Sequence, residues 1–146
     1  MFKYNLIVMP IFSVNTYTID CIFEVISNKI NIIQNGTINI VFLDDDSIKN
    51  LNNNYRKIDK STDVLSFHYY DDFTDLNDED IAGEIIMSET KIKTQAIEYG
   101  LGEEKEFYKL LIHSILHILG FDHEIDEEYK IMQNLEENIY KEVFEK

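Results

Sequence analysis

The 146-residue chain has one cysteine, one proline and no tryptophan. The single cysteine, Cys21, cannot form an internal disulfide, and its apolar neighbours Ile19, Ile22 and Phe23 predict a core position in a reducing compartment. No segment approaches the ~20 consecutive apolar residues that a membrane-spanning helix needs. The N-terminus also lacks the apolar region of a signal peptide. We therefore expect a cytoplasmic protein without a membrane partner.

Positive charge is scarce as well. The 13 basic and 28 acidic residues give a formal net charge of −15. Proteins that bind nucleic acid usually carry a basic face, because neutralising phosphates releases counterions. The few cations are grouped, however: Arg56, the only arginine, stands with Lys57 and Lys60, and Lys91 and Lys93 follow a later strand. The sequence therefore allows a local basic patch on a chain that is otherwise strongly acidic.

Length and patterning indicate the fold class. A chain of 146 residues buries roughly two-thirds of its unfolded surface, which is enough for one core. We find no repeat, linker or low-complexity segment, so we expect a single domain over residues 1–146. Strands are expected over residues 2–9, 37–43, 63–69 and 81–87. Five helices are expected: one over about 15–33, one that begins at a cap among residues 44–46, one from Ser88 to Gly100, one from Glu103 through the histidines, and one that begins at a cap at Asp126. This alternation predicts a mixed α/β (α+β) fold with helices packed on a small sheet.

Three of the four histidines, His113, His117 and His123, lie in one short segment. His113 and His117 are four positions apart, so on a helix their rings point to the same side. Gly120 can adopt the left-handed conformation that ends a helix and would turn the chain so that His123 approaches the pair. Three neutral imidazoles and an open fourth position are typical of a catalytic zinc, which activates a bound water. We therefore predict one Zn²⁺ held by these three residues.

The alternative is that the histidines are structural. A lone histidine on an apolar helix is more often a packed or surface residue than a ligand. Here, however, Ile112, Ile115 and Leu116 surround the pair, so unliganded rings would have nitrogens that need partners. The shared spacing and the helix-ending glycine favour a metal site.

Ser114 separates this segment from zinc peptidases. The peptidase motif HExxHxxGxxH has the same spacing, but its glutamate, which serves as general base, is replaced here by Ser114. A serine hydroxyl cannot take a proton from water at neutral pH. We expect Ser114 to be a small packing residue, and a metallopeptidase-like hydrolase remains an alternative.

Two further motifs accompany the histidine segment HSILHILGFDH at 113–123. They are NYRKIDKSTDVLSF at 54–67 and AGEIIMS at 82–88. With these three motifs in this order, the chain resembles the YbeY endoribonucleases, also called rRNA maturation factors. It departs from the usual family pattern at Ser61 and His68, where the family usually has proline, at Glu84, where it has aspartate, and at Ser114, where it has glycine.

The resemblance implies a hydrolase, a zinc-dependent endoribonuclease that cleaves single-stranded RNA. It further implies maturation of the 3′ end of small-subunit (16S) rRNA, ribosome quality control, and the small ribosomal subunit and assembly factors as partners. It also implies a central histidine helix on a roughly four-stranded sheet. A non-catalytic, metal-stabilised ribosome-binding factor is the alternative from another class.

Arg56 corresponds to a family arginine that is implicated in activity. A guanidinium is always charged and donates two parallel hydrogen bonds to a phosphate, so we expect Arg56 to act with His113, His117 and His123 in catalysis. The alternative is an ion pair with Asp59 or Asp63.

Other polar and aromatic residues in these motifs carry weaker expectations. Asp122 could orient a ligand imidazole or cap the turn after the helix. We expect His68 to be a surface or cleft histidine rather than a fourth ligand. The aromatic side chains of this region could stack on bases but are more often sheet residues; they are Phe67, Tyr69 and Tyr70.

Overall fold

The computed structural model describes residues 1–7, 10, 12–100, 102–122 and 124–145. Its elements in chain order are β1 (Lys3–Leu6), α1 (Thr16–Lys29), β2 (Thr37–Leu43), α2 (Asp45–Arg56), β3 (Val64–His68), β4 (Ile81–Ser88), α3 (Glu89–Tyr99), α4 (Glu103–Ile118) and α5 (Asp126–Phe144). The strands form one sheet in the order β1-β2-β4-β3. β1, β2 and β4 are parallel, and β3 runs antiparallel to β4. The predicted mixed α/β fold with a small four-stranded sheet is confirmed.

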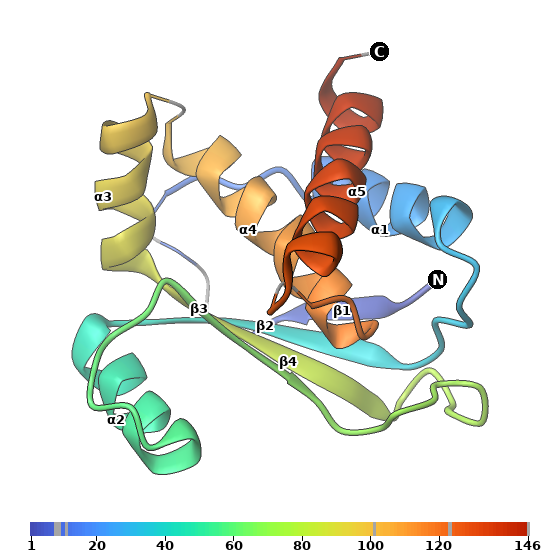
Figure 1. Cartoon of the computed structure of the whole chain (residues 1–146), viewed down its shortest axis with the longest axis horizontal. Coiled ribbons are helices and arrows are strands. Elements are labelled where there is room, and N and C mark those ends of the chain that lie inside the picture. The colour runs from blue at the N-terminus through green and yellow to red at the C-terminus, as the bar shows by residue number, and fades with distance from the viewer. Residues whose placement is uncertain (8–9, 11, 101, 123, 146) are drawn as a thin grey trace.

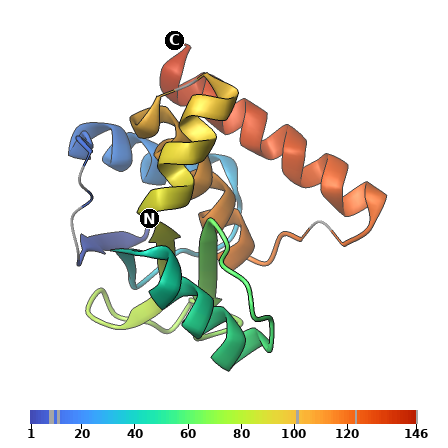
Figure 2. The same cartoon turned by 90° about the vertical axis from the view of Figure 1, so that its left-hand side faces the viewer.

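The helices lie on both faces of the sheet. Figure 1 shows α1, α3, α4 and α5 on one side and α2 on the other, and Figure 2 shows the same separation from the side. Parallel neighbouring strands need a crossover segment, and α1 provides one between β1 and β2. The sheet therefore has one thick helical layer and one short helix opposite it.

The histidine helix α4 is the centre of the thick layer, as predicted. It packs against α3, α5 and the strands β3 and β4. Phe107, Leu111, Ile115 and Leu116 on this helix are fully buried. A helix with so much apolar surface is stable only when it is enclosed. The last turns of α4 are thus held rigidly over the sheet.

Several helix ends follow the predicted signals. The Asp44 side chain accepts a hydrogen bond from the backbone N–H of Ser47 at 2.7 Å and caps α2. Ser88 caps α3 through the N–H of Lys91 at 3.1 Å, and Gly100, with φ +70°, ends that helix. The caps at 44–46 and Ser88 and the end at Gly100 are therefore confirmed.

Three local predictions were wrong. Asp126 is the first residue of α5 rather than its cap, because Ile125 holds the cap position and makes no side-chain cap bond. Cys21 is half-buried at the edge of the core rather than inside it. Among the described residues β1 ends at Leu6, short of the predicted residue 9, while residues 8 and 9 lie outside the described part.

None of the helices in the described part of the chain has both the length and the apolar character needed to cross a membrane.

Candidate active site

The last turns of α4 bring His113 and His117 together. Their rings are nearly perpendicular, at 81°, with centroids 4.5 Å apart. The two Nε2 atoms lie 3.0 Å from each other. Either one shared proton or one cation between the two nitrogens can satisfy this arrangement.

The donor pair fits a metal ion. Two ligands of a tetrahedral Zn²⁺ with bonds of ~2.0 Å lie about 3.3 Å apart, close to the separation of the two Nε2 atoms. After α4, Gly120 adopts φ +103°, so the chain turns as predicted. His123, the third predicted ligand, lies outside the described residues. Within the described part of the chain, no group of three or more His, Cys, Asp or Glu side chains gathers in a metal-binding arrangement.

A cleft of about 590 Å³ lies in front of the two histidines. Its lining residues come from the end of α2, the segment through β3, the end of α4 and the turn that follows; they are Arg56, residues 62–68, His113, His117, residues 120–122 and Glu124. Arg56 therefore shares one cleft with the histidine pair. In the described part of the chain no ion pair joins Arg56 to Asp59 or Asp63, and Asp59 instead lies 3.9 Å from the Lys49 Nζ.

Hydrogen bonds fix the segment that leads to Arg56. The Asp45 carboxylate accepts bonds from the hydroxyls of Ser61, at 2.9 Å, and Ser88, at 2.6 Å. It thereby joins the start of α2 to the chain before β3 and to the end of β4. Charge-assisted bonds of this kind are stronger than neutral ones, so they hold α2 firmly.

A second tie lies closer to the arginine. The buried Asn52 side chain donates a hydrogen bond from Nδ2 to the Lys60 carbonyl oxygen at 2.8 Å. This bond holds residues 57–60 back against α2. Arg56 is the last residue of α2, so it lies between the helix and the segment that this bond holds. Its backbone is therefore fixed on both sides where it reaches the cleft.

The wall formed by β3 requires a glycine on β4. A Cβ added at Gly83 would lie 2.5 Å from the Phe67 carbonyl oxygen, which no real side chain tolerates.

Two tyrosines make contacts near this wall. The hydroxyl of Tyr69 donates a hydrogen bond to Glu84. Burial and this bond raise the pKa of Tyr69 to about 12. The Tyr55 ring meets the Phe67 ring edge-on, with centroids 5.7 Å apart.

Ser114 does not share the cleft. Its side chain is fully buried, and among the described residues its hydroxyl oxygen has no hydrogen-bond partner. A hydroxyl enclosed in the core cannot reach a substrate in the cleft. The structure therefore agrees with the expected packing role.

The two remaining candidates, Asp122 and His68, both line the cleft. The Nδ1 of His68 lies 3.2 Å from the Tyr70 carbonyl oxygen, an obligate acceptor, so Nδ1 carries the proton. As expected, His68 is a cleft histidine.

The basic patch suggested by the sequence does not form the cleft lining. Of the described residues that line the cleft, Arg56 is the one with a cationic side chain, and Asp63, Asp122 and Glu124 are acidic. The lysines near it in sequence are absent from this lining. The cleft itself is therefore short of positive charge.

Sequence reasoning missed one residue of the site, Glu136 on α5. Its carboxylate accepts a hydrogen bond from the Nδ1 of His113. Glu136 lies four residues after the buried Met132 and three before the buried Ile139, so it belongs to the helix face that packs inward. An acidic residue within an apolar stripe marks Glu136 as a candidate but does not identify His113 as its partner.

The chain was also compared with known proteins. The family model described as Endoribonuclease YbeY matches residues 13–144. A protein of Caldicellulosiruptor bescii named "Endoribonuclease YbeY" is 40% identical over 114 residues, covering 73% of this chain and 72% of that protein. A protein of the same name from Fusobacterium nucleatum is 36% identical over 140 residues, covering 94% of this chain and 85% of that protein.

A solved structure gives the same result for the fold. The solution structure of the Thermotoga maritima protein TM1509 is similar with a TM-score of 0.61 and 27% identity, over 99% of this chain and 89% of that one. The three motifs, the fold and the histidine–arginine cleft thus agree with the sequence matches over nearly the whole chain. The chain belongs to the YbeY endoribonuclease family.

Proposed function

We propose that this chain is a single-domain, zinc-dependent endoribonuclease that cleaves single-stranded RNA and matures the 3′ end of 16S rRNA. Membership of a family named for endoribonuclease activity supports the reaction class. The one observation that most supports the active-site assignment is the shared cleft of Arg56, His113 and His117. In this proposal the protein acts in the cytoplasm with the small ribosomal subunit and assembly factors, and residues 1–146 act as one domain.

The proposed metal ligands are His113, His117 and His123. Two of them already present Nε2 atoms 3.0 Å apart, a separation that suits one small cation. A bound Zn²⁺ would supply Lewis-acid chemistry, activating water or polarising a phosphoryl oxygen. Imidazole also suits nickel, copper and iron, so the choice of zinc depends partly on supply.

The charges of the cleft favour the binding of a cation. One guanidinium, that of Arg56, faces a lining that includes the carboxylates of Asp63, Asp122 and Glu124. A phosphodiester entering such a cleft meets net negative charge, which disfavours binding. A divalent cation at the histidines would reverse this balance.

Arg56 is proposed to hold the scissile phosphate. Its guanidinium has five N–H donors in a planar fork that matches two phosphate oxygens. Because it lines the same cleft as His113 and His117, it can orient the phosphate toward the histidines and stabilise the charge that develops there.

The peptidase alternative gains no support from the site. The position of the peptidase glutamate is Ser114, whose side chain lies in the core. A non-catalytic ribosome-binding factor would keep the metal and the fold but would show no turnover.

One assay distinguishes these functions. Protein purified without a histidine tag is stripped of metal with a chelator, divided, and either left bare or given one equivalent of Zn²⁺. Each sample is incubated with single-stranded RNA, double-stranded RNA and an unstructured peptide. We expect cleavage of single-stranded RNA by the zinc-loaded sample alone. Peptide cleavage would favour the peptidase, and RNA binding without cleavage would favour the non-catalytic factor.

A further inference from the structure

Helix α5 packs on α4 through an apolar stripe that contains one carboxylate. Met132 and Ile139 are buried, and Glu136 lies between them on the same face. Burying part of a charged group has a free-energy cost unless a hydrogen bond satisfies it. Here the side chain of Glu136 remains 31% exposed and bonds to the Nδ1 of His113.

The two ring nitrogens of His113 therefore have different surroundings. The Nε2 atom faces His117 and the cleft, while the Nδ1 atom faces Glu136 on the far side. A carboxylate accepts but does not donate, so this bond keeps a proton on Nδ1 and leaves the Nε2 lone pair directed into the cleft.

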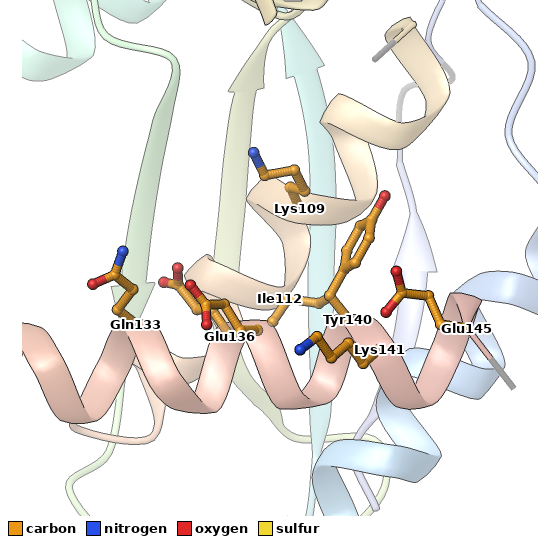
Figure 3. Close-up of a pocket in the computed structure, with 8 residues that line it drawn as sticks. Lys109, Ile112, Gln133, Glu136, Tyr140, Lys141 and Glu145 are labelled. Carbon is orange, nitrogen blue, oxygen red and sulfur yellow. The ribbon is translucent and has the colours of Figure 1, made fainter. Parts of the chain in front are cut away.

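The orientation of the His113 ring is only partly fixed by packing. Behind it lies a second cavity of about 190 Å³, lined by His113, Tyr129, Met132, Gln133 and Glu136. Glu136 further borders a groove of about 370 Å³ between α4 and α5, which Figure 3 shows with Ile112 and Tyr140 nearby. With open space on both sides, packing alone does not fix the ring of His113.

We propose that Glu136 is a positioning residue, which holds the His113 ring and its proton so that Nε2 is presented as a metal donor. The inference rests on the proposed metal site of the preceding subsection. It extends that site from α4 to α5, because the packing of Met132 and Ile139 sets where the carboxylate lies. The α4–α5 contact is then part of the metal site as well as of the core.

Carboxylates that orient a ligand histidine are known to affect metal binding strongly. Loss of such a partner typically weakens metal affinity by about 10–100-fold. A carboxylate that served only to stabilise the α4–α5 contact would change the melting temperature without changing the intrinsic affinity of the folded site.

The test is a zinc competition titration on the full chain with a chromophoric chelator. The variants are Glu136→Gln, which nearly keeps the shape, and Glu137→Gln as the matched control. Glu137 is the next residue, is exposed, and borders the same groove, so its variant makes the same change in net charge. We expect Glu136→Gln to bind zinc about 10–100-fold more weakly and Glu137→Gln to bind like the original chain.

A second readout does not depend on zinc. Two-bond ¹H–¹⁵N spectra of the metal-free protein at one fixed pH report which ring nitrogen carries the proton. We expect His113 to be protonated at Nδ1 in the original chain and in Glu137→Gln, and to become a mixture in Glu136→Gln.

The outcomes separate the two proposals. If the original chain does not bind zinc, the proposed metal site is wrong and this inference is lost with it. If the original chain binds zinc and Glu136→Gln binds it equally well with an unchanged His113 proton position, the metal site stands and the positioning role of Glu136 is wrong.

Discussion

The Nε2 atoms of His113 and His117 lie 3.0 Å apart on successive turns of α4. Two nitrogen atoms with lone pairs directed at the same point repel each other unless a proton or a cation lies between them. The helix spacing sets this distance, which one shared proton can bridge. The open cleft in front of the pair gives a cation access to take the place of that proton.

Removing one of these rings should therefore remove the metal. His117→Ala leaves most of α4 in place, and we expect the variant to retain less than stoichiometric zinc and to lose RNA cleavage. Its melting temperature should fall only by what zinc binding contributed. Elemental analysis after gel filtration measures the zinc content.

His68→Ala is the control for that substitution. His68 lines the same cleft from β3, with its Nδ1 turned to the Tyr70 carbonyl oxygen. We expect this variant to keep its zinc. Stoichiometric zinc in His117→Ala would contradict the ligand assignment.

Arg56→Lys separates phosphate positioning from metal binding. The lysine keeps the positive charge but replaces a planar fork of donors with a single ammonium group. We expect zinc content to stay near one per chain, while single-turnover RNA cleavage falls by about 10²–10³-fold and RNA affinity falls less. Unchanged cleavage would show that Arg56 has a structural role.

Ser114→Ala tests whether the serine takes part in the reaction. Its hydroxyl is buried and has no partner among the described residues, so replacing it with a methyl group removes an unsatisfied polar atom. We expect unchanged zinc content and cleavage, with the free energy of unfolding raised by about 1 kcal/mol in urea titrations. Loss of turnover with zinc still bound would place the hydroxyl in the chemistry.

Glu106 should make stability depend on pH. Its side chain is buried on α4, its Oε2 has no partner in the described part of the chain, and burial raises its pKa while Lys109 opposes that shift. Since the folded-state pKa exceeds the unfolded-state pKa, the folded chain binds more protons between the two values. The free energy of unfolding therefore falls as pH rises through that interval.

Glu106→Gln removes this dependence. We expect the variant to be more stable than the original chain at pH 7–8, on the order of 1 kcal/mol, with the difference vanishing below about pH 4, where the acid is protonated in both states. Urea titrations at several pH values measure it, with the exposed Glu98→Gln as control. A constant difference at all pH values would contradict this explanation.

Much of the fold could be predicted because local signals determine it. The strand Thr37–Leu43 follows directly after a turn at residues 35–36. The helix between Ser88 and Gly100 begins at a serine cap and ends at a glycine with positive φ. The spacing of His113 and His117 likewise needs only one helix. The cap at Asp126 was a wrong prediction because the side chain of an acidic residue can equally occupy the first helical turn, where the helix dipole also favours it.

The parts that could not be predicted depend on long-range packing. Glu136 reaches His113 only because α5 folds back on α4, and no local pattern specifies that contact. The charge of the cleft was also unpredictable. It depends on which face of the chain Asp63 and Glu124 occupy, and these acids, rather than the lysines near Arg56, line the cleft.

The most direct test of the account is single-turnover cleavage of a labelled single-stranded RNA by untagged protein, before and after chelation and after return of one equivalent of Zn²⁺. His117→Ala is carried through the same cycle. We expect cleavage that disappears with the metal, returns with zinc in the original chain, and does not return in the variant. Cleavage that persists unchanged in the metal-free original chain would contradict zinc-dependent catalysis.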